Sequence, residues 1–370
     1  MIQAKPQDLR RPLKGQISQS SGVPSKFVLV NTGVLTKFKP EIEEEVRMNI
    51  TGKLRYFFDN YPFLCPACGT PLGAVAVSDD NTLTCLNGHE FRILDQVPAL
   101  TLEAYDSSVQ QEDTLNSFNF QYAALEWIYD YDCRRVSRIV EHNVGLTADD
   151  VADMRVLVVG CGSGAEIEIF KQLGARSVIG IDLSTSLAEA QKRQLLNDNT
   201  IVIRADAACI PVAKQSFDLI YCDGVLPHTE APEEITSAMT QLLAPGGALY
   251  LRTLLKPVSL RARLQLMPRK LLRKFTKVLT PKSLWSISYV FALLSKIPLA
   301  GSVFKRLFIY YDVNEDDLRI TRLTNFRMYG DHTYRHHLSA EQVVNAIERD
   351  MPEIVIQRIG SFFKGSLPLE

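Results

Sequence analysis

The sequence predicts an α/β fold in which parallel strands alternate with helices, and three features in the middle of the chain support this. The uncharged run Val156–Val159 has the apolar character of a strand buried on both faces of a sheet. It ends in a glycine-rich turn. After one helical length, a second apolar run closes on Asp182, 22 residues beyond Gly160. Strand, turn, helix and strand in this order form the unit from which parallel sheets are built.

The turn after the first strand carries Gly160, Gly162 and Gly164. Glycine permits a tight turn and lets a ligand approach the backbone closely. The carboxylate of Asp182, at the tip of the second strand, suits the two hydroxyl groups of a ribose. Glu166 follows the loop closely and would repel a diphosphate. We therefore expect a nucleoside that carries positive charge.

Five consecutive segments resemble the motifs of class I S-adenosylmethionine-dependent methyltransferases of the type 11 group. They read VLVVGCGSG, VIGIDLS, IVIRADAACIPVAKQSFD, FDLIYCDGVLPH and LLAPGGALYLRT. Their order and spacing, over about residues 120–255, favour this family over a Rossmann-type unit for another nucleotide. The resemblance implies a Rossmann-like, seven-stranded methyltransferase sheet and an enzyme that uses S-adenosylmethionine as its methyl donor.

The resemblance also implies cofactor-binding roles for individual residues. The methionine part of the cofactor would lie over the glycine loop, Gly160, Cys161, Gly162 and Gly164. Asp182 would bind the ribose, and Leu183 would pack on the adenine. Asp206 would accept a hydrogen bond from the adenine amine, and Ala207 would offer its backbone amide to the ring.

Two further positions are candidates for contact with the cofactor. Asp223 ends the predicted fourth strand, where the amino group of the cofactor or the acceptor would lie, and a solvated loop acid is the alternative. Tyr122 belongs to an aromatic-rich helical approach over residues 116–144. In this family the equivalent helix can close over the cofactor, and core packing is the alternative.

Methyl transfer chiefly requires alignment of the reacting atoms, and a base is needed only where the nucleophile must lose a proton. His228, after the fourth strand, is the candidate for a base or an acceptor contact. Tyr334, His336 and His337 precede the last predicted helix, a position that overlies the acceptor pocket in the family. These three would orient the acceptor or act as a base, and a surface loop is the alternative.

The segment 63–102 has the spacing of a metal site. Cys65 and Cys68 form a CxxC pair, and Cys85 and His89 form a CxxxH pair further on. Three thiolates and one imidazole predict a closed, structural zinc site, whereas a redox dithiol is the alternative for CxxC alone. The segment resembles the N-terminal zinc ribbon of bacterial large-subunit rRNA guanine-N1 methyltransferases. Its end, FRILDQVPAL, resembles that of small zinc-ribbon proteins that activate tRNA and protein methyltransferases.

The segment Lys256–Arg306 contains twelve Lys or Arg and no Asp or Glu. Apolar residues at helical spacing and several prolines predict short helices. Because the segment follows the fifth strand, we expect it to form a lid over the acceptor pocket. Its charge indicates an anionic acceptor or contact with a membrane surface, and a solvated helical cap is the alternative.

These signals divide the chain into five parts. They are a polar tail (1–25), an N-terminal strand and helix extension (26–62), the zinc ribbon (63–102), the methyltransferase domain (116–255 plus 312–370) and a basic helical cap or lid (256–311).

The composition indicates a cytoplasmic protein. The net charge is −1, scattered cysteines suit a reducing compartment, and no basic-then-apolar leader begins the chain. We expect a methyltransferase for a small, anionic or biosynthetic-intermediate acceptor, in which the ribbon is structural or forms a homodimer. An RNA methyltransferase that grips its substrate with the ribbon is the alternative, and near-neutral charge without a stacking platform disfavours it.

Overall fold

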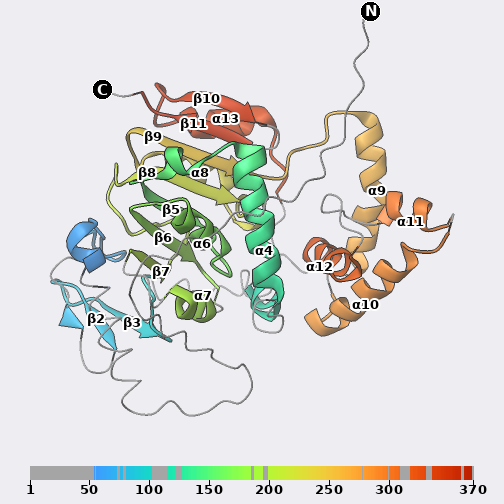
Figure 1. The fold of residues 1–370 in the computed structure, drawn as a ribbon, viewed down its shortest axis with the longest axis horizontal. Coiled ribbons are helices and arrows are strands. Elements are labelled where there is room, and N and C mark those ends of the chain that lie inside the picture. The colour runs from blue at the N-terminus through green and yellow to red at the C-terminus, as the bar shows by residue number, and fades with distance from the viewer. Residues whose placement is uncertain are drawn as a thin grey trace, which may run out of the picture.

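The structure is a computed structural model. It describes residues 54, 56–72, 76–77, 81–101, 115–121, 127–184, 187–194, 199–276, 278–298, 300–308, 317–330, 336–359 and 362–368. The predicted tail (1–25) and most of the predicted extension (26–62) lie outside the described residues. Figure 1 shows a large sheet with its helices, a small β-unit near one edge, and a group of helices standing to the other side.

The large sheet has seven strands in the order β10-β11-β9-β8-β5-β6-β7. Strands β5 to β9 are parallel, and β11 runs antiparallel to both β9 and β10. This confirms the predicted Rossmann-like, seven-stranded fold. The strands are β5 (Arg155–Val159), β6 (Ser177–Asp182), β7 (Thr200–Arg204), β8 (Phe217–Asp223), β9 (Leu243–Arg252), β10 (Val355–Ile359) and β11 (Phe362–Ser366).

Helices cover both faces of this sheet. Val156 and Val158 of β5 belong to the apolar core with helices α4, α6 and α7, whereas Leu157 and Val159 belong to the core with α8 and α13. The strand is therefore buried on both faces, as its uncharged run predicts. The helices of this domain are α4 (Trp127–Arg138), η1 (Ile139–Val144), α5 (Ala148–Val151), α6 (Ala165–Gln172), α7 (Leu187–Gln194), η2 (Leu226–His228), α8 (Pro232–Thr240) and α13 (Ala340–Glu348).

The strand order reverses at β5. Strands β6 and β7 follow on one side of β5, and β8 and β9 follow on the other. In open α/β sheets, ligands bind in the crevice outside the carboxyl ends of the strands at such a reversal. The fold therefore predicts the site at the ends of β5 and β8.

The small β-unit has four antiparallel strands, β1 (Ala76–Val77), β2 (Thr82–Thr84), β3 (Glu90–Leu94) and β4 (Val97–Pro98). It joins the large sheet at β7, because Ala99 forms a parallel bridge with Arg204 and the Leu100 N–H donates to the Arg204 carbonyl at 2.9 Å. A second bridge links Phe63 to Val212. The unit thus covers part of the outer strand of the sheet, whose backbone groups would otherwise face solvent.

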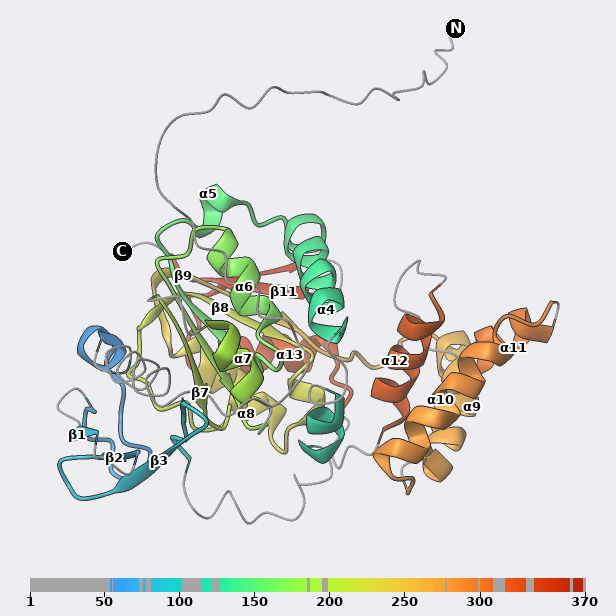
Figure 2. The same ribbon diagram turned by 60° about the horizontal axis from the view of Figure 1, so that its bottom comes forward.

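Four helices form a group beside the sheet, as Figure 2 shows: α9 (Leu260–Thr276), α10 (Pro281–Leu294), α11 (Ala300–Phe308) and α12 (Leu318–Tyr329). The predicted boundary at residue 312 places α12 with the sheet. In the structure α12 lies against α10, because the buried Phe326 packs edge-on against Trp285 with ring centroids 5.4 Å apart. The helical group therefore extends to α12. None of the described helices is long and apolar enough to cross a membrane.

One paired arginine connects this helical group to the sheet domain. The Arg327 guanidinium on α12 donates to both carboxylate oxygens of Asp132 on α4, at 3.1 and 3.0 Å, and to the Gln121 side chain at 2.8 Å. The Asp132 side chain is only 6% exposed. A bidentate pair at this depth fixes orientation as well as distance, so it holds α12 against α4.

Candidate functional site

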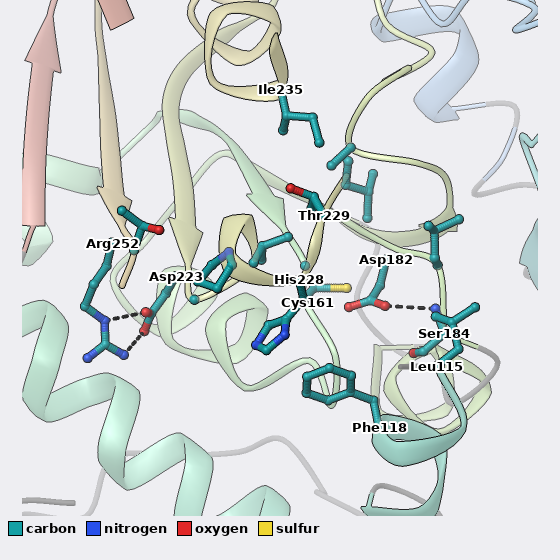
Figure 3. Close-up of a pocket in the computed structure, with 18 of the residues that line it drawn as sticks. Leu115, Phe118, Cys161, Asp182, Ser184, Asp223, His228, Thr229, Ile235 and Arg252 are labelled. Atoms are coloured by element: carbon teal, nitrogen blue, oxygen red, sulfur yellow. Dashed lines mark hydrogen bonds and ion pairs between the residues drawn. The ribbon is translucent and has the colours of Figure 1, made fainter. Parts of the chain in front are cut away.

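A cavity of about 700 Å³ lies where the fold predicts it, at the carboxyl ends of the central strands (Figure 3). This volume is within the usual range for cofactor and small-molecule sites. The cavity is lined by most of the predicted cofactor residues: Gly160, Cys161, Asp182, Leu183, Asp206, Ala207 and Asp223. Gly162 and Gly164 belong to the same turn but are not among the lining residues.

The glycine loop has a backbone that other residues adopt poorly. Gly160, Gly162 and Gly164 have φ angles of +73°, +45° and +84°. A Cβ atom on Gly160 would lie 2.1 Å from Cγ2 of Val225, in the loop after β8. Glycine at position 160 therefore satisfies two requirements, the left-handed backbone and the close approach of the two loops.

The Asp182 carboxylate is held by two backbone donors. The Gly162 N–H donates to Oδ2 at 2.9 Å, and the Ser184 N–H donates to Oδ1 at 2.8 Å, which Figure 3 shows. Each carboxylate oxygen can accept a second hydrogen bond. The carboxylate is thus fixed in place while it keeps acceptor capacity for a ligand with two neighbouring hydroxyl groups.

Asp206 follows β7, the strand that neighbours β6. The Ala208 N–H donates to its Oδ1 at 2.8 Å, and its side chain lines the cavity. Burial raises the pKa of Asp206, against the effect of the Ala208 N–H. Asp182 and Asp206 therefore offer two acceptor groups from the ends of adjacent strands.

Asp223 is not the solvated loop acid that we considered as an alternative, because its side chain is only 2% exposed. It is the direct partner of Arg252 in the β8–β9 register, and the Arg252 Nη2 donates to its Oδ2 at 2.6 Å. Arg135 of α4 approaches the same carboxylate to 3.6 Å. Burial alone would raise the pKa of Asp223, but the two guanidinium groups hold it below its usual value.

Glu166 brings a second buried acid to this end of the cavity. Its Oε1 lies 3.9 Å from Nη2 of Arg135. Burial raises the pKa of Glu166 to about 7, although Arg135 opposes this shift. The sequence marked Glu166 only as an obstacle to diphosphate, and it gave no sign of Arg135, which arrives on a separate helix.

Acidic groups outnumber basic ones around the cavity. Three arginines line it, Arg135, Arg252 and Arg327, against six acids, Asp132, Glu166, Asp182, Asp206, Asp223 and Glu230. The formal charge of this set is negative, which favours a cationic ligand over a diphosphate. The expectation from the sequence on this point is therefore consistent with the cavity lining.

The structure separates the predicted catalytic residues. His228 lines the cavity, and its ring meets that of Phe118 edge-on with centroids 5.6 Å apart (Figure 3). The backbone N–H of His336 donates to the Pro227 carbonyl at 2.9 Å, but neither His336 nor His337 is among the lining residues. Tyr334 and Tyr122 lie outside the described residues.

The basic segment does not occupy the place of the lid that we expected. Of the described helical group, the cavity lining includes Thr324, Arg327 and Met328 of α12, and no described residue between 256 and 308. The reason is that α12 lies between the cavity and the other helices, held by the Arg327–Asp132 pair. The positive charges that suggested an anionic acceptor are thus absent from the described lining.

The four predicted metal ligands lie together in the small β-unit. The ligand atoms of Cys65, Cys68, Cys85 and His89 are all within 4.8 Å of one another. The Cys68 and Cys85 sulfurs are 3.9 Å apart, and His89 Nδ1 lies 3.4 Å from the Cys85 sulfur and 3.8 Å from that of Cys65. In tetrahedral zinc sites with Zn–S bonds of about 2.3 Å, neighbouring ligand atoms are about 3.5–3.8 Å apart. The cluster therefore has the dimensions of a closed zinc site.

Comparison with known proteins assigns the central segment. Residues 157–251 match a methyltransferase domain. The match starts within β5 and ends within β9, so the methyltransferase domain model covers the glycine loop, Asp182, Asp206 and Asp223.

Curated relatives match the same region of the chain. A ubiquinone biosynthesis O-methyltransferase of Xanthomonas oryzae pv. oryzae is 39% identical over 108 residues, which are 28% of this chain and 45% of that protein. A protein of the same name from Burkholderia multivorans is 37% identical over 107 residues, which are 28% of this chain and 46% of that protein. The chain thus spans about half the length of the curated relatives it matches.

Solved structures show weaker similarity. An S-adenosylmethionine-dependent methyltransferase from Mesorhizobium loti has a TM-score of 0.38 at 16% identity, covering 62% of this chain and 96% of that chain. The magnesium protoporphyrin IX methyltransferase of Synechocystis, solved with bound SAH, has a TM-score of 0.37 at 14% identity, covering 65% and 83%. The fold of the present chain is defined by its own strand order.

Replacing Gly160 by alanine should destabilise the methyltransferase domain more than the same change at Gly145. Both residues have a left-handed backbone, which costs an alanine about 1–2 kcal/mol. A Cβ at position 145 meets nothing within 4 Å, whereas one at position 160 overlaps Val225. Denaturant unfolding should therefore show a clearly larger loss for Gly160→Ala.

The double variant Gly160→Ala/Val225→Ala tests the cause of the difference. Removal of the Val225 methyl groups should restore part of the stability lost in Gly160→Ala. Equal losses for the two glycine variants, or no recovery in the double variant, would contradict the close loop approach.

Proposed function

We propose that the protein is an S-adenosylmethionine-dependent methyltransferase that acts on a hydroxyl group of a small molecule. The observation that carries the proposal is the juxtaposition of Asp182 and Asp206 with the glycine loop in one acid-rich cavity. A nucleoside with a ribose, an adenine and a cationic tail is complementary to this set of groups. The match of residues 157–251 to a methyltransferase domain supports the same conclusion.

The residues present fit the cofactor. Asp182 would accept from the ribose hydroxyls, and Asp206, Leu183 and Ala207 would hold the adenine. The methionine end would lie near the glycine loop, where the buried acid Glu166 suits an ammonium group and Arg135 suits a carboxylate. When bound, the cofactor supplies a methyl group that its sulfonium has already activated for displacement.

The acceptor side of the cavity is formed by Phe118, His228 and the α12 residues Thr324 and Met328. A hydroxyl group must lose its proton to become a good nucleophile, and His228 is a described lining residue suited to receive it. The relatives' name, O-methyltransferase, supports transfer to oxygen. The apolar side chains of Phe118 and Met328 suit an apolar body on the acceptor.

We also propose that Cys65, Cys68, Cys85 and His89 bind one structural zinc ion. A four-ligand protein shell is closed, so the ion would stabilise the small β-unit without contacting the acceptor. The unit buries few side chains of its own, and metal binding would supply much of its folding free energy.

Asp182→Ala should weaken binding of S-adenosylmethionine by about 100-fold, because two hydrogen bonds to a charged acceptor are lost, worth about 3 kcal/mol together. Isothermal titration calorimetry measures the change. Asp149→Ala, at an exposed acid in the first turn of α5, is the matched control and should bind normally. Unchanged affinity in Asp182→Ala would contradict the ribose assignment.

The acceptor class can be read from the fate of a labelled methyl group. With labelled cofactor and a cell extract, the label should enter solvent-extractable small molecules as an alkali-stable ether. His228→Gln should lower kcat by about 100-fold because proton removal is lost, while cofactor affinity stays unchanged. His142→Gln, an exposed histidine on η1, is the control. Label recovered in RNA would overturn the small-molecule assignment.

Elemental analysis should find one zinc ion per chain, and Cys68→Ser should release it because a closed site loses a thiolate ligand. The melting temperature of the β-unit should fall, whereas cofactor affinity should be retained. Cys209→Ser, at an exposed cysteine outside the cluster, is the control and should keep the metal. A full zinc complement in Cys68→Ser would rule out this ligand set.

A further inference from the structure

Helix α9 presents a stripe of apolar side chains to solvent. The stripe consists of Leu260, Leu264, Met267, Leu271 and Phe275, with exposed fractions of 71, 55, 60, 59 and 67%. The spacing of three and four residues places all five on one face of the helix. Soluble surfaces seldom expose so continuous an apolar row without a binding function.

The opposite face of α9 is the one that packs on the protein. Leu272 lies against the core formed by α10 and α12, and Thr276 is buried, its hydroxyl donating to the Tyr329 carbonyl at 3.0 Å. At 100° per residue, Leu272 and Thr276 lie on the side of the helix away from the centre of the stripe. The need for a core therefore does not explain the stripe.

Basic residues border the stripe. On the same helical projection, Arg263, Lys270 and Lys274 lie along one side of it and Arg261 along the other. Residues 256–306 contain no acid, although the whole chain is close to neutral. The neighbouring helix continues the apolar surface with exposed side chains of its own, Tyr289, Val290, Leu293 and Ile297.

This combination of apolar stripe and basic border identifies one kind of partner. An RNA duplex or loop would match the positive charge but not five exposed side chains of which four are aliphatic. A lipid surface matches both features, because anionic headgroups attract the basic border while the acyl boundary accepts the stripe. No described helix can cross a membrane, so the contact would lie in the plane of the surface.

We propose that α9 binds the surface of an anionic lipid bilayer, with its apolar stripe at the boundary between headgroups and acyl chains. The helical group stands to one side of the sheet (Figures 1 and 2), so α9 can meet a flat surface without displacing the methyltransferase domain. Helix α12 belongs both to this group and to the cavity wall. The proposal concerns binding alone and does not depend on the reaction.

Vesicle co-sedimentation of the full chain tests the proposal. Phosphatidylcholine vesicles that contain about one third phosphatidylglycerol should bind the protein at least about tenfold more tightly than pure phosphatidylcholine vesicles. Added salt should weaken this preference, because it screens the attraction.

Two double variants separate the apolar and charged contributions. Leu264→Gln/Leu271→Gln should lower binding to the anionic vesicles at least about tenfold. Lys270→Gln/Lys274→Gln should lower it several-fold and remove most of its salt dependence. The matched controls are Val355→Gln, at a 67% exposed residue of β10, and Lys192→Gln, on α7, and both should bind as the unchanged protein does.

Three results would overturn the proposal. The first is no binding of the unchanged protein to anionic vesicles. The second is binding that the stripe variant leaves unaltered. The third is a dimer by light scattering that Leu264→Gln/Leu271→Gln converts to a monomer while vesicle binding is absent, which would assign the stripe to a second copy of the chain. Binding of RNA with no binding of vesicles would likewise assign the charges to nucleic acid.

Discussion

The complete burial of β5 is the constraint on which the rest of the structure depends. The strand is paired with β6 and β8 at its two edges and packed by helices on both faces, so it can carry no polar side chain along its buried length. Polar chemistry can begin only where the strand ends. The reversal of strand order at β5 opens a crevice at that same point, and a glycine turn is the backbone that can pass through it.

The cavity combines rigid acceptors with charges that compensate one another. Asp182 is fixed by two backbone N–H groups, whereas Asp223 is fixed by Arg252 and Arg135 from two different elements. Such pairing keeps a buried carboxylate ionised, and the absence of a close partner leaves Glu166 easy to protonate. One end of the cavity thus carries fixed negative charge and the other carries charge that depends on its occupant.

The sequence predicted the parts of the site that are local in the chain. The glycine loop, Asp182 and Asp206 each follow directly from a strand end, and the cysteine pairs lie on short turns. Arg135, Arg252 and Arg327 escaped prediction because each reaches the cavity from an element whose position is decided by packing. The lid was misplaced for a similar reason: helical spacing located α9, but two rows of apolar residues did not reveal which one faces the core.

The β-unit that holds the cysteine cluster also acts as a cover for a sheet edge. Its Ala99–Leu100 segment takes up backbone groups of β7 that could otherwise pair with a strand from another molecule. If a metal ion maintains this unit, metal shortage would first endanger solubility, since an uncovered edge is a template for aggregation. The amount of protein in a cell would then follow the supply of zinc even though the chemistry at the cavity does not use it.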